Sequence, residues 1–217
     1  MWKPLALMRH AQLSSSSVTK NAPDPSRNRL LASGRSLFSE LGYENTQTAA
    51  IARRAGTSES QLVRYFGGKA GLLAAIFDTA WYDINARVHD LLTDAPDARH
   101  AVLGIFNTML AAFERDHDLA TLFMLEGRRI RAGSHEVRLS PGLVEFSDTV
   151  HRLIKRGQQD GSFAQGLDST ALATALMGAA EAMIRERLLV RRRGSARSFT
   201  NAQLQRIFKA MLEGLGP

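Results

Sequence analysis

The sequence predicts an all-α protein with a small N-terminal domain, a long connecting helix and a larger C-terminal domain. Apolar residues recur at steps of three and four over most of the chain, which is the spacing of one helix face. No stretch shows the alternation of a half-buried strand, and no Asn-Gly hairpin signal is present. Capping residues and glycines divide the chain into separate helical segments. We therefore expect the secondary structure to be helical throughout.

Composition restricts the class of protein. With 217 residues, 44% of them hydrophobic, the chain is long enough for one or two domains with a sizeable core. It has no cysteine, which excludes disulfides and thiolate metal sites. No apolar run approaches the ~20 residues of a membrane span, and no apolar segment of a secretory signal follows the basic N-terminus. We expect a cytoplasmic protein that makes no contact with a membrane.

The excess positive charge is concentrated near the N-terminus. The net charge is +7; residues 1–80 carry ten Lys and Arg against five Asp and Glu, and residues 81–217 carry eighteen against sixteen. A basic domain favours a polyanionic partner such as nucleic acid. The same excess can also serve only solubility, so charge by itself leaves both interpretations open.

Residues 1–25 are predicted as a flexible N-terminal extension. They contain four consecutive serines at 14–17 and two close prolines, Pro23 and Pro25, and they lack an apolar pattern. Three interpretations remain open: a tail without a role, a later start at Met8, or a basic arm that follows a neighbouring minor groove through Lys3, Arg9 and Lys20.

The first helix of a three-helix domain at residues 26–80 is predicted at residues 26–41. Asp24 or Ser26 can cap its start, and Pro25 suits a position in the first turn. One apolar stripe at helical spacing supplies the core of this domain: Leu30, Leu31, Leu37, Phe38 and Leu41.

Residues 47–66 are predicted as two short helices joined by a tight turn. Gly56 can adopt the positive φ that ends the first helix, and Ser58 with Gln61 has the spacing of a capping box. Leu62 and Phe66 fall on one face of the second helix, and its polar residues fall on the opposite face. Two helices joined in this way form a helix-turn-helix, whose second helix enters the major groove of DNA.

The polar face of the second helix carries groups that can read base edges. Arg64 suits guanine, Gln61 suits adenine, Glu59 suits cytosine, and Ser60 is a fourth candidate. Phosphates are expected at hydroxyls, at helix N-termini and at a positive charge. The complete set of predicted DNA-binding residues is Thr46, Gln47, Thr57, Ser58, Glu59, Ser60, Gln61, Arg64, Tyr65 and Lys69.

A long helix is predicted from Lys69 to about Leu92, at the boundary with a second domain at residues 81–217. At 1.5 Å per residue its length is about 35 Å, enough to connect two domains. In the second domain we expect helices at residues 97–115, 118–131, 141–157, 168–193 and 200–214. Gly157 and Gly161 are both expected to end a helix.

The C-terminal domain contains a set of residues that can line a ligand-binding cavity. Methionine and phenylalanine give adaptable, polarisable walls, and cavities between helices commonly bind small molecules, although packed core is the simpler interpretation of each residue. Arg128, Arg129 and Arg131 can neutralise an acidic ligand or can lie at a solvated helix end. The predicted ligand-binding residues are Phe106, Met109, Leu110, Phe113, Phe123, Met124, Met177 and Glu181.

No catalytic or metal-binding arrangement is recognisable. The six histidines lack metal-ligand spacing, and phosphate-binding or nucleophile motifs are missing from the sequence. His117 between Asp116 and Asp118 is more typical of a solvated loop than of a metal site. We expect no catalytic residues, no metal and no cofactor.

Small residues at Gly178, Ala179 and Ala180 can let another helix approach closely. Together with the last helix they can form a dimer interface, or they can serve tight packing within one chain. Arg191, Arg192 and Arg193 follow the long helix, where positive charge stabilises a C-terminus.

The residues from Arg29 to Ile76 resemble the DNA-binding region of the TetR family of transcriptional regulators. The resemblance depends on fixed spacings that include Phe38, Gly42, Tyr43, Thr46, Ile51, Ala52, Ala55, Gly56, Ser58, Leu62, Tyr65, Phe66, Lys69, Leu72 and Leu73. It implies a homodimer formed by the last two long helices, and a helix from Lys69 that transmits ligand binding to the DNA-binding domain. The family usually has a tyrosine at Val63, whose hydroxyl contacts a phosphate; valine cannot make that contact.

These features favour a ligand-released repressor that acts as a homodimer on a palindromic operator in double-stranded DNA, with a largely apolar small molecule as effector. The first alternative is a helical small-molecule-binding protein or enzyme with a vestigial DNA-binding domain. The second is a basic protein that coats DNA without sequence preference. Affinity for a preferred duplex, compared with a random duplex over a range of salt concentrations, separates the three.

Overall fold

The computed structural model describes residues 24–129, 140–192 and 199–216. Within these ranges the secondary structure is nine α-helices without a strand. The predictions for residues 1–23 and for the arginines at 128, 129, 131 and 191–193 lie outside the described side chains. The helices are α1 (Pro25–Leu41), α2 (Thr48–Arg54), α3 (Glu59–Phe66), α4 (Lys69–Asp94), α5 (Ala98–Arg115), α6 (His117–Arg129), α7 (Pro141–Asp160), α8 (Ser169–Arg192) and α9 (Asn201–Glu213).

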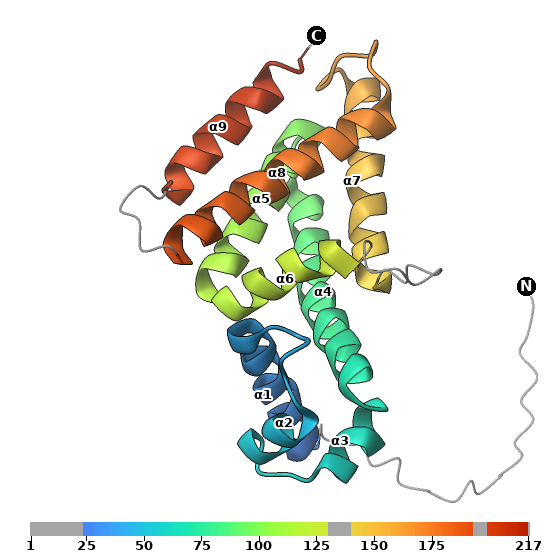
Figure 1. Ribbon diagram of the computed structural model, residues 1–217. Coiled ribbons are helices and arrows are strands. Elements are labelled where there is room, and N and C mark those ends of the chain that lie inside the picture. Colours follow the sequence, from blue (N-terminus) through green and yellow to red (C-terminus); the bar gives the residue numbers. More distant parts are fainter. Residues whose placement is uncertain (1–23, 130–139, 193–198, 217) are drawn as a thin grey trace, which may run out of the picture.

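Helices α1, α2 and α3 form a small unit at one end of the molecule, and α4 continues from it into the remaining helices (Figure 1). The interior of this unit is the predicted apolar stripe of α1 packed on side chains of α2, α3 and α4. Leu30, Phe38, Ile51, Leu62 and Leu72 are fully buried there. Leu41, which was predicted to belong to the stripe, is instead about half exposed, because it is the last residue of α1.

Gly71 sets how closely α4 can approach α3. A Cβ atom at this position would lie 1.7 Å from the backbone oxygen of Phe66. We expect Gly71→Ala to lower the free energy of unfolding by about 1–3 kcal/mol, since the contacting atom is backbone and cannot rotate away. Urea unfolding would measure this loss. Gly166→Ala is the control, because a Cβ there meets nothing within 4 Å; equal stability of the two variants would contradict the close packing.

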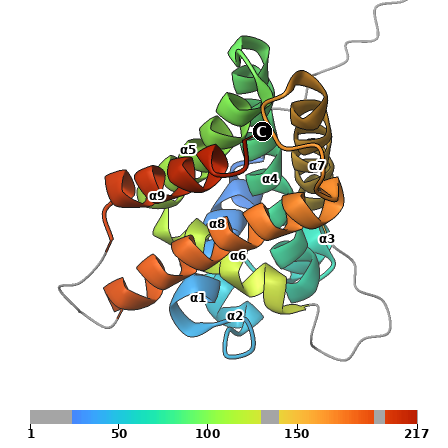
Figure 2. The same cartoon turned by 90° about the horizontal axis from the view of Figure 1, so that it is seen from above.

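The remaining helices surround the second half of α4. Helices α5 and α7 pack on α4, α8 packs on α7, and α9 packs on α5 (Figure 2). Helix α6 crosses between α1 and this group and contacts α1, α5 and α8. The predicted division at residue 80 therefore falls inside one continuous helix, which packs against helices on both sides of that point.

Local sequence accounts for most helix ends. Asp97 accepts a hydrogen bond from the backbone N–H of His100 at the start of α5, and Thr200 and Gln203 form a capping box at α9. Gly161 ends α7 with φ of +82°, as predicted. The prediction for Gly157 was wrong: it lies inside α7, where a Cβ would be 2.3 Å from the ring of Phe163. The small size of Gly157 allows the Phe163 ring to pack closely against α7.

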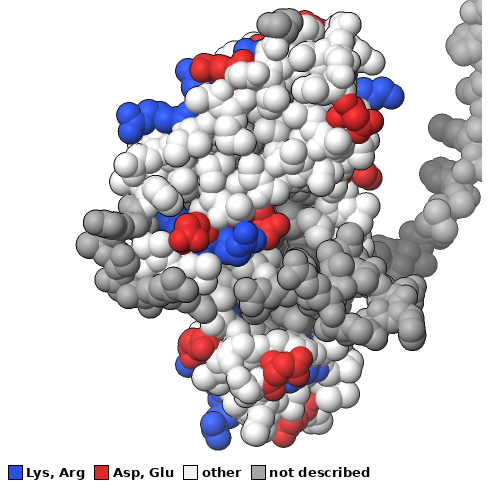
Figure 3. Space-filling view, turned by 45° about the horizontal axis from the view of Figure 1, so that its top comes forward, with Lys and Arg blue, Asp and Glu red and all other residues white. Residues whose placement is uncertain are grey.

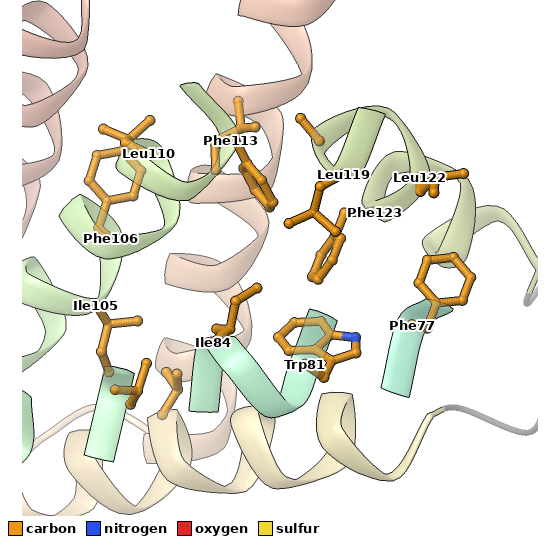
Figure 4. Close-up of a cluster of buried hydrophobic side chains, with 14 of the residues drawn as sticks. Phe77, Trp81, Ile84, Ile105, Phe106, Leu110, Phe113, Leu119, Leu122 and Phe123 are labelled. Carbon is orange, nitrogen blue, oxygen red and sulfur yellow. The ribbon is translucent and has the colours of Figure 1, made fainter. Parts of the chain in front are cut away.

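The core of the larger part is rich in aromatic side chains. Trp81 of α4 lies 4.5 Å from Phe123 of α6 and 5.1 Å from Phe146 of α7, measured between ring centres. Phe113 of α5 lies 5.2 Å from Phe123. Figure 4 shows Trp81, Phe113 and Phe123 converging from three helices. None of the helices in the described ranges has both the length and the apolar character of a membrane span.

Candidate functional site

Helix α3 is defined at both ends by local sequence. Ser58 Oγ accepts a hydrogen bond from Gln61 N, and Gln61 Oε1 accepts one from Ser58 N, each at 3.3 Å, which is the predicted capping box. Gly67 ends the helix in the left-handed conformation at φ of +70°. Thr48 Oγ1 at the start of α2 donates to Glu59 Oε2 at 2.5 Å, so the two short helices are also connected at their first turns.

One edge of α3 is buried and the other is exposed. Leu62 is completely buried, whereas Glu59, Ser60 and Arg64 are exposed to solvent. Val63 is 55% exposed, so an apolar side chain lies on the same outward surface. This arrangement leaves a polar helical edge available to a partner, with the buried edge fixed to the core.

Thr46 and Thr57 do not point toward that surface. Thr46 is 1% exposed, and its hydroxyl donates to the carbonyl oxygens of Leu37 at 3.1 Å and Gly42 at 2.7 Å. The hydroxyl oxygen of Thr57 is buried and makes no hydrogen bond in the described structure. Packing of the turns before and after α2 thus turns both hydroxyls inward, so a contact of Thr46 or Thr57 with DNA stays a prediction that these hydroxyl positions do not support.

Other predicted DNA-binding residues are engaged within the domain. Gln61 contributes Oε1 to the capping box, so it can read adenine in bidentate fashion only by leaving that bond. Lys69 Nζ donates to the carbonyl oxygens of Tyr43 at 3.0 Å and Thr46 at 3.1 Å, and lies 4.4 Å from the centre of the Tyr43 ring. Gln47 is exposed at the N-cap of α2 and makes no capping bond with its side chain.

Tyr65 at the end of α3 connects the helix to the start of α1. Its hydroxyl donates to a carboxylate oxygen of Asp24 and accepts a hydrogen bond from Arg64 at 3.0 Å. The guanidinium of Arg27 lies 5.3 Å from the centre of the Phe66 ring. Asp24 and Arg27 thus belong to the α3 surface, which the sequence did not predict, because only the tertiary packing brings together residues about 40 positions apart.

The predicted ligand-binding residues largely converge on one cavity of about 300 Å³. Phe106, Met109, Phe113, Phe123, Met124, Met177 and Glu181 all line it. Leu110 does not, because it faces the neighbouring core between α5 and α8. The other wall residues lie outside the predicted set: Trp81, Val102, Ile105, Leu143, Phe146, Val150, Leu176, Ala180, Ile184 and Phe208.

The cavity wall is apolar except at Glu181. The side chain of Glu181 is 54% exposed, and its carboxylate forms an ion pair with Arg185 at 3.0 Å on the same helix. Phe106 and Phe208 stack with ring centres 4.1 Å apart and close the side formed by α5 and α9. Such a cavity suits an apolar group, because a buried polar ligand would find few partners there.

An ion pair connects α1 with the junction between α5 and α6. Arg35 lies 2.6 Å from a carboxylate oxygen of Asp116. The other oxygen of Asp116 accepts a hydrogen bond from the backbone N–H of Leu119 in the first turn of α6. Phe113 and Phe123, which line the cavity, lie on either side of this junction. This ion pair thus connects α1 to the junction of the two helices that carry Phe113 and Phe123.

No grouping of three or more His, Asp or Glu side chains suited to a metal ion occurs in the part of the chain that the structure describes. His117 is exposed at the first residue of α6.

Comparison with known proteins shows which families and structures this chain resembles. Residues 30–76 match the sequence model of the bacterial regulatory proteins, tetR family. The chain is 24% identical over 142 residues to the HTH-type transcriptional repressor KstR2 of Rhodococcus jostii, covering 65% of this chain and 70% of that protein.

Two solved structures share the fold over nearly the whole chain. The fatty acid degradation regulator FadR from Bacillus halodurans has a TM-score of 0.77 and 20% identity, covering 90% of this chain and 97% of that one. FadR from Bacillus subtilis in complex with stearoyl-CoA has a TM-score of 0.73 and 19% identity, covering 87% and 97%.

Proposed function

We propose that this chain, whose residues 30–76 match the model of the tetR family of bacterial regulatory proteins, is a homodimeric repressor that binds a palindromic operator and is released by a largely apolar effector. The observation that carries the proposal is the continuity of α4. Its first turns pack under α3, and Trp81 in its middle lines the cavity. One rigid element thus touches both the proposed DNA-contact surface and the proposed effector site.

For DNA binding we propose that α3 enters the major groove with Glu59, Ser60 and Arg64 toward base edges. These three side chains are exposed on the edge opposite to buried Leu62. Phosphate contacts are assigned to Gln47 and Ser58 at helix N-termini and to Tyr65 and Lys69. Lys69 must then share its charge between phosphate and the carbonyl oxygens that it already contacts.

For the effector we propose a molecule with a saturated or ring-shaped apolar part, of the acyl-thioester class. The chemistry of the cavity supports the apolar part, since aromatic and methionine side chains form its wall. The similarity to a FadR that forms a complex with stearoyl-CoA supports the thioester class. A volume of about 300 Å³ is at the small end of ligand cavities, so a long chain requires the wall to move.

Release of DNA would follow from this movement. An effector that pushes Phe123 or Phe113 outward displaces the α5–α6 junction, where Asp116 is paired with Arg35 of α1. The effector can shift the equilibrium only by its difference in affinity between the two arrangements.

The dimer is assigned to α8 and α9. Ile207 and Met211 of α9 are 48% and 38% exposed, and Leu189 of α8 is 39% exposed. A Cβ at Gly178 of α8 would meet nothing within 4 Å, so no helix of the same chain packs against it. Figure 3 shows a wide surface of uncharged residues on the upper part of the molecule, bordered by a few Lys, Arg, Asp and Glu side chains. Burial of this apolar face in a second copy is the proposed reason for its composition.

The dimer assignment predicts that Ile207→Glu combined with Met211→Glu converts the protein to a monomer, because two carboxylates would be buried in an apolar interface. Sedimentation velocity would measure the oligomeric state of both variants. Ala202→Glu combined with Gln205→Glu is the control, since it adds the same charge at the start of the same helix. A dimer that persists in the first variant would rule out α9 as an interface.

The function as a whole is tested by selection of bound duplexes from a random pool, followed by titration with acyl-CoA thioesters. We expect a palindromic consensus and release of the duplex by a thioester with a sufficiently long apolar chain. Binding that shows no preference between the selected and random duplexes would favour the DNA-coating alternative, and thioester binding without any duplex binding would favour the vestigial domain.

A further inference from the structure

Asp24 occupies a position that the capping of α1 does not fully explain. Its Oδ1 accepts a hydrogen bond from the backbone N–H of Ser26 at 2.8 Å, which is the ordinary role of an N-cap residue. Its Oδ2 accepts a hydrogen bond from the hydroxyl of Tyr65, 41 residues later at the end of α3. The second contact is not needed to start a helix, and it directs a negative charge toward the proposed DNA-contact surface.

Arg64 is joined to the same contact. Its guanidinium donates to the Tyr65 hydroxyl at 3.0 Å and lies 4.8 Å from the centre of the Tyr65 ring. Asp24, Tyr65 and Arg64 therefore form a chain of hydrogen bonds on the surface, with the carboxylate at one end and the guanidinium at the other. The hydrogen bond from Tyr65 is the largest cause that holds the pKa of Asp24 below its usual value, followed by the bond from Ser26. Asp24 is therefore ionised at neutral pH.

We infer that Asp24 is a positioning residue of the DNA-contact surface, whose carboxylate competes with operator phosphate for the Tyr65 hydroxyl and, through it, orients Arg64. This inference rests on the proposed function of α3. A carboxylate and a phosphate oxygen accept hydrogen bonds from the same donors, so both cannot hold the single hydroxyl proton of Tyr65. Any duplex that uses Tyr65 must first displace Asp24, and it does so against the repulsion of like charges.

The consequence is an affinity for DNA that is lower than the same surface would have without Asp24. A repressor that holds DNA too tightly cannot be released by an effector with a modest difference in affinity between its two arrangements. Asp24 lowers the affinity by a local contact and leaves the fold of α3 unchanged.

The test compares the wild type with Asp24→Asn, Tyr65→Phe and the double variant. Asparagine keeps an oxygen that can cap α1 and removes the negative charge. We expect Asp24→Asn to tighten binding to selected and random duplexes on the order of two- to fivefold at low salt, as for an exposed charge pair. We also expect a steeper dependence of affinity on salt concentration. Both effects should be clearly smaller in the Tyr65→Phe background, because only the general repulsion between the carboxylate and phosphate is left there.

Glu44→Gln serves as the matched control, since it removes one exposed carboxylate from the same domain without touching Tyr65 or Arg64. An Asp24→Asn variant that binds DNA no more tightly than the wild type would overturn the inference. So would an equal gain in the Tyr65→Phe background, or in Glu44→Gln, because the effect would then be one of net charge only.

A measurement without DNA separates this inference from the proposed function. The carboxyl signal of Asp24, followed by NMR during a pH titration, should show a pKa that rises toward the usual value when Tyr65 is replaced by phenylalanine. If the wild type prefers no duplex sequence, the proposed function fails. The NMR titration still shows whether the Tyr65 hydroxyl is hydrogen-bonded to Asp24. If the pKa of Asp24 is the same with and without the Tyr65 hydroxyl, the inference fails whatever the DNA results are.

Discussion

Replacement of Arg64 by alanine is expected to remove the preference for one base pair in each half of the operator. Arg64 is exposed on the outward edge of α3, so truncation leaves the core of the domain intact. A bidentate contact from arginine to guanine contributes about 1–3 kcal/mol of discrimination, which corresponds to a loss of affinity for the preferred site of roughly 5- to 150-fold. Competition titrations against operators changed at single base pairs would measure this loss.

Arg53→Ala is the matched control for this prediction. Arg53 is also an exposed arginine of the helix-turn-helix, but it lies in the last turn of α2 and not on α3. Its removal should weaken all duplexes alike, with the base preferences unchanged. If Arg64→Ala behaves in the same way as Arg53→Ala, Arg64 contacts only phosphate and the assignment of α3 contacts must change.

Filling the cavity is expected to abolish the response to effector while DNA binding is kept. Ala180 of α8 lines the cavity of about 300 Å³, and a phenylalanine ring at this position would occupy a large part of it. We expect the effector to bind at least 100-fold more weakly, a cost of about 3 kcal/mol, because bulky groups placed into an occupied apolar site meet the overpacking penalty. Operator affinity should stay within a factor of about two, because one added ring is smaller than the cavity and need not push Phe113 and Phe123 outward as the proposed effector does.

The control is Ala111→Phe, which adds the same ring to the solvent-exposed side of α5. Both variants should be compared by calorimetry with an acyl-CoA thioester and by duplex release in its presence. Normal release in Ala180→Phe would show that the effector binds elsewhere. The groove of about 570 Å³ between α1, α4, α5 and α6 would then be the next site to test.

Local patterns predicted the helices well, because each helix end depends on a few neighbouring residues. The capping box of Ser58 and Gln61, the start of α1 after Asp24 and the left-handed end at Gly161 all involve residues within four positions of one another. At Gly157, local patterns were not sufficient to predict the helix end. A glycine inside α7 and a glycine after it look alike in sequence, and only the approach of Phe163 distinguishes them.

The candidate sites were predictable to different degrees. The predicted cavity residues lie on α5, α6 and α8, and seven of the eight predicted side chains line one cavity. Leu110 lies between Met109 and Phe113 along α5, but its side chain lies toward the neighbouring part of α8. Residues contributed by α4, α7 and α9 were missed, because a sequence pattern gives the buried face of a helix but not the helix that lies opposite.

By itself, the sequence determined that the chain is helical and where α3 begins and ends. It also determined that residues 29–76 have the residue spacing of the TetR family. These features depend on hydrogen bonds and apolar steps within one or two turns. Only the tertiary structure decided that Thr46 and Thr57 turn inward, that Lys69 holds the loop before α2, and that Asp24 meets Tyr65. Those outcomes depend on contacts between residues that are distant in the chain, and no local pattern encodes which distant groups the folded backbone brings together.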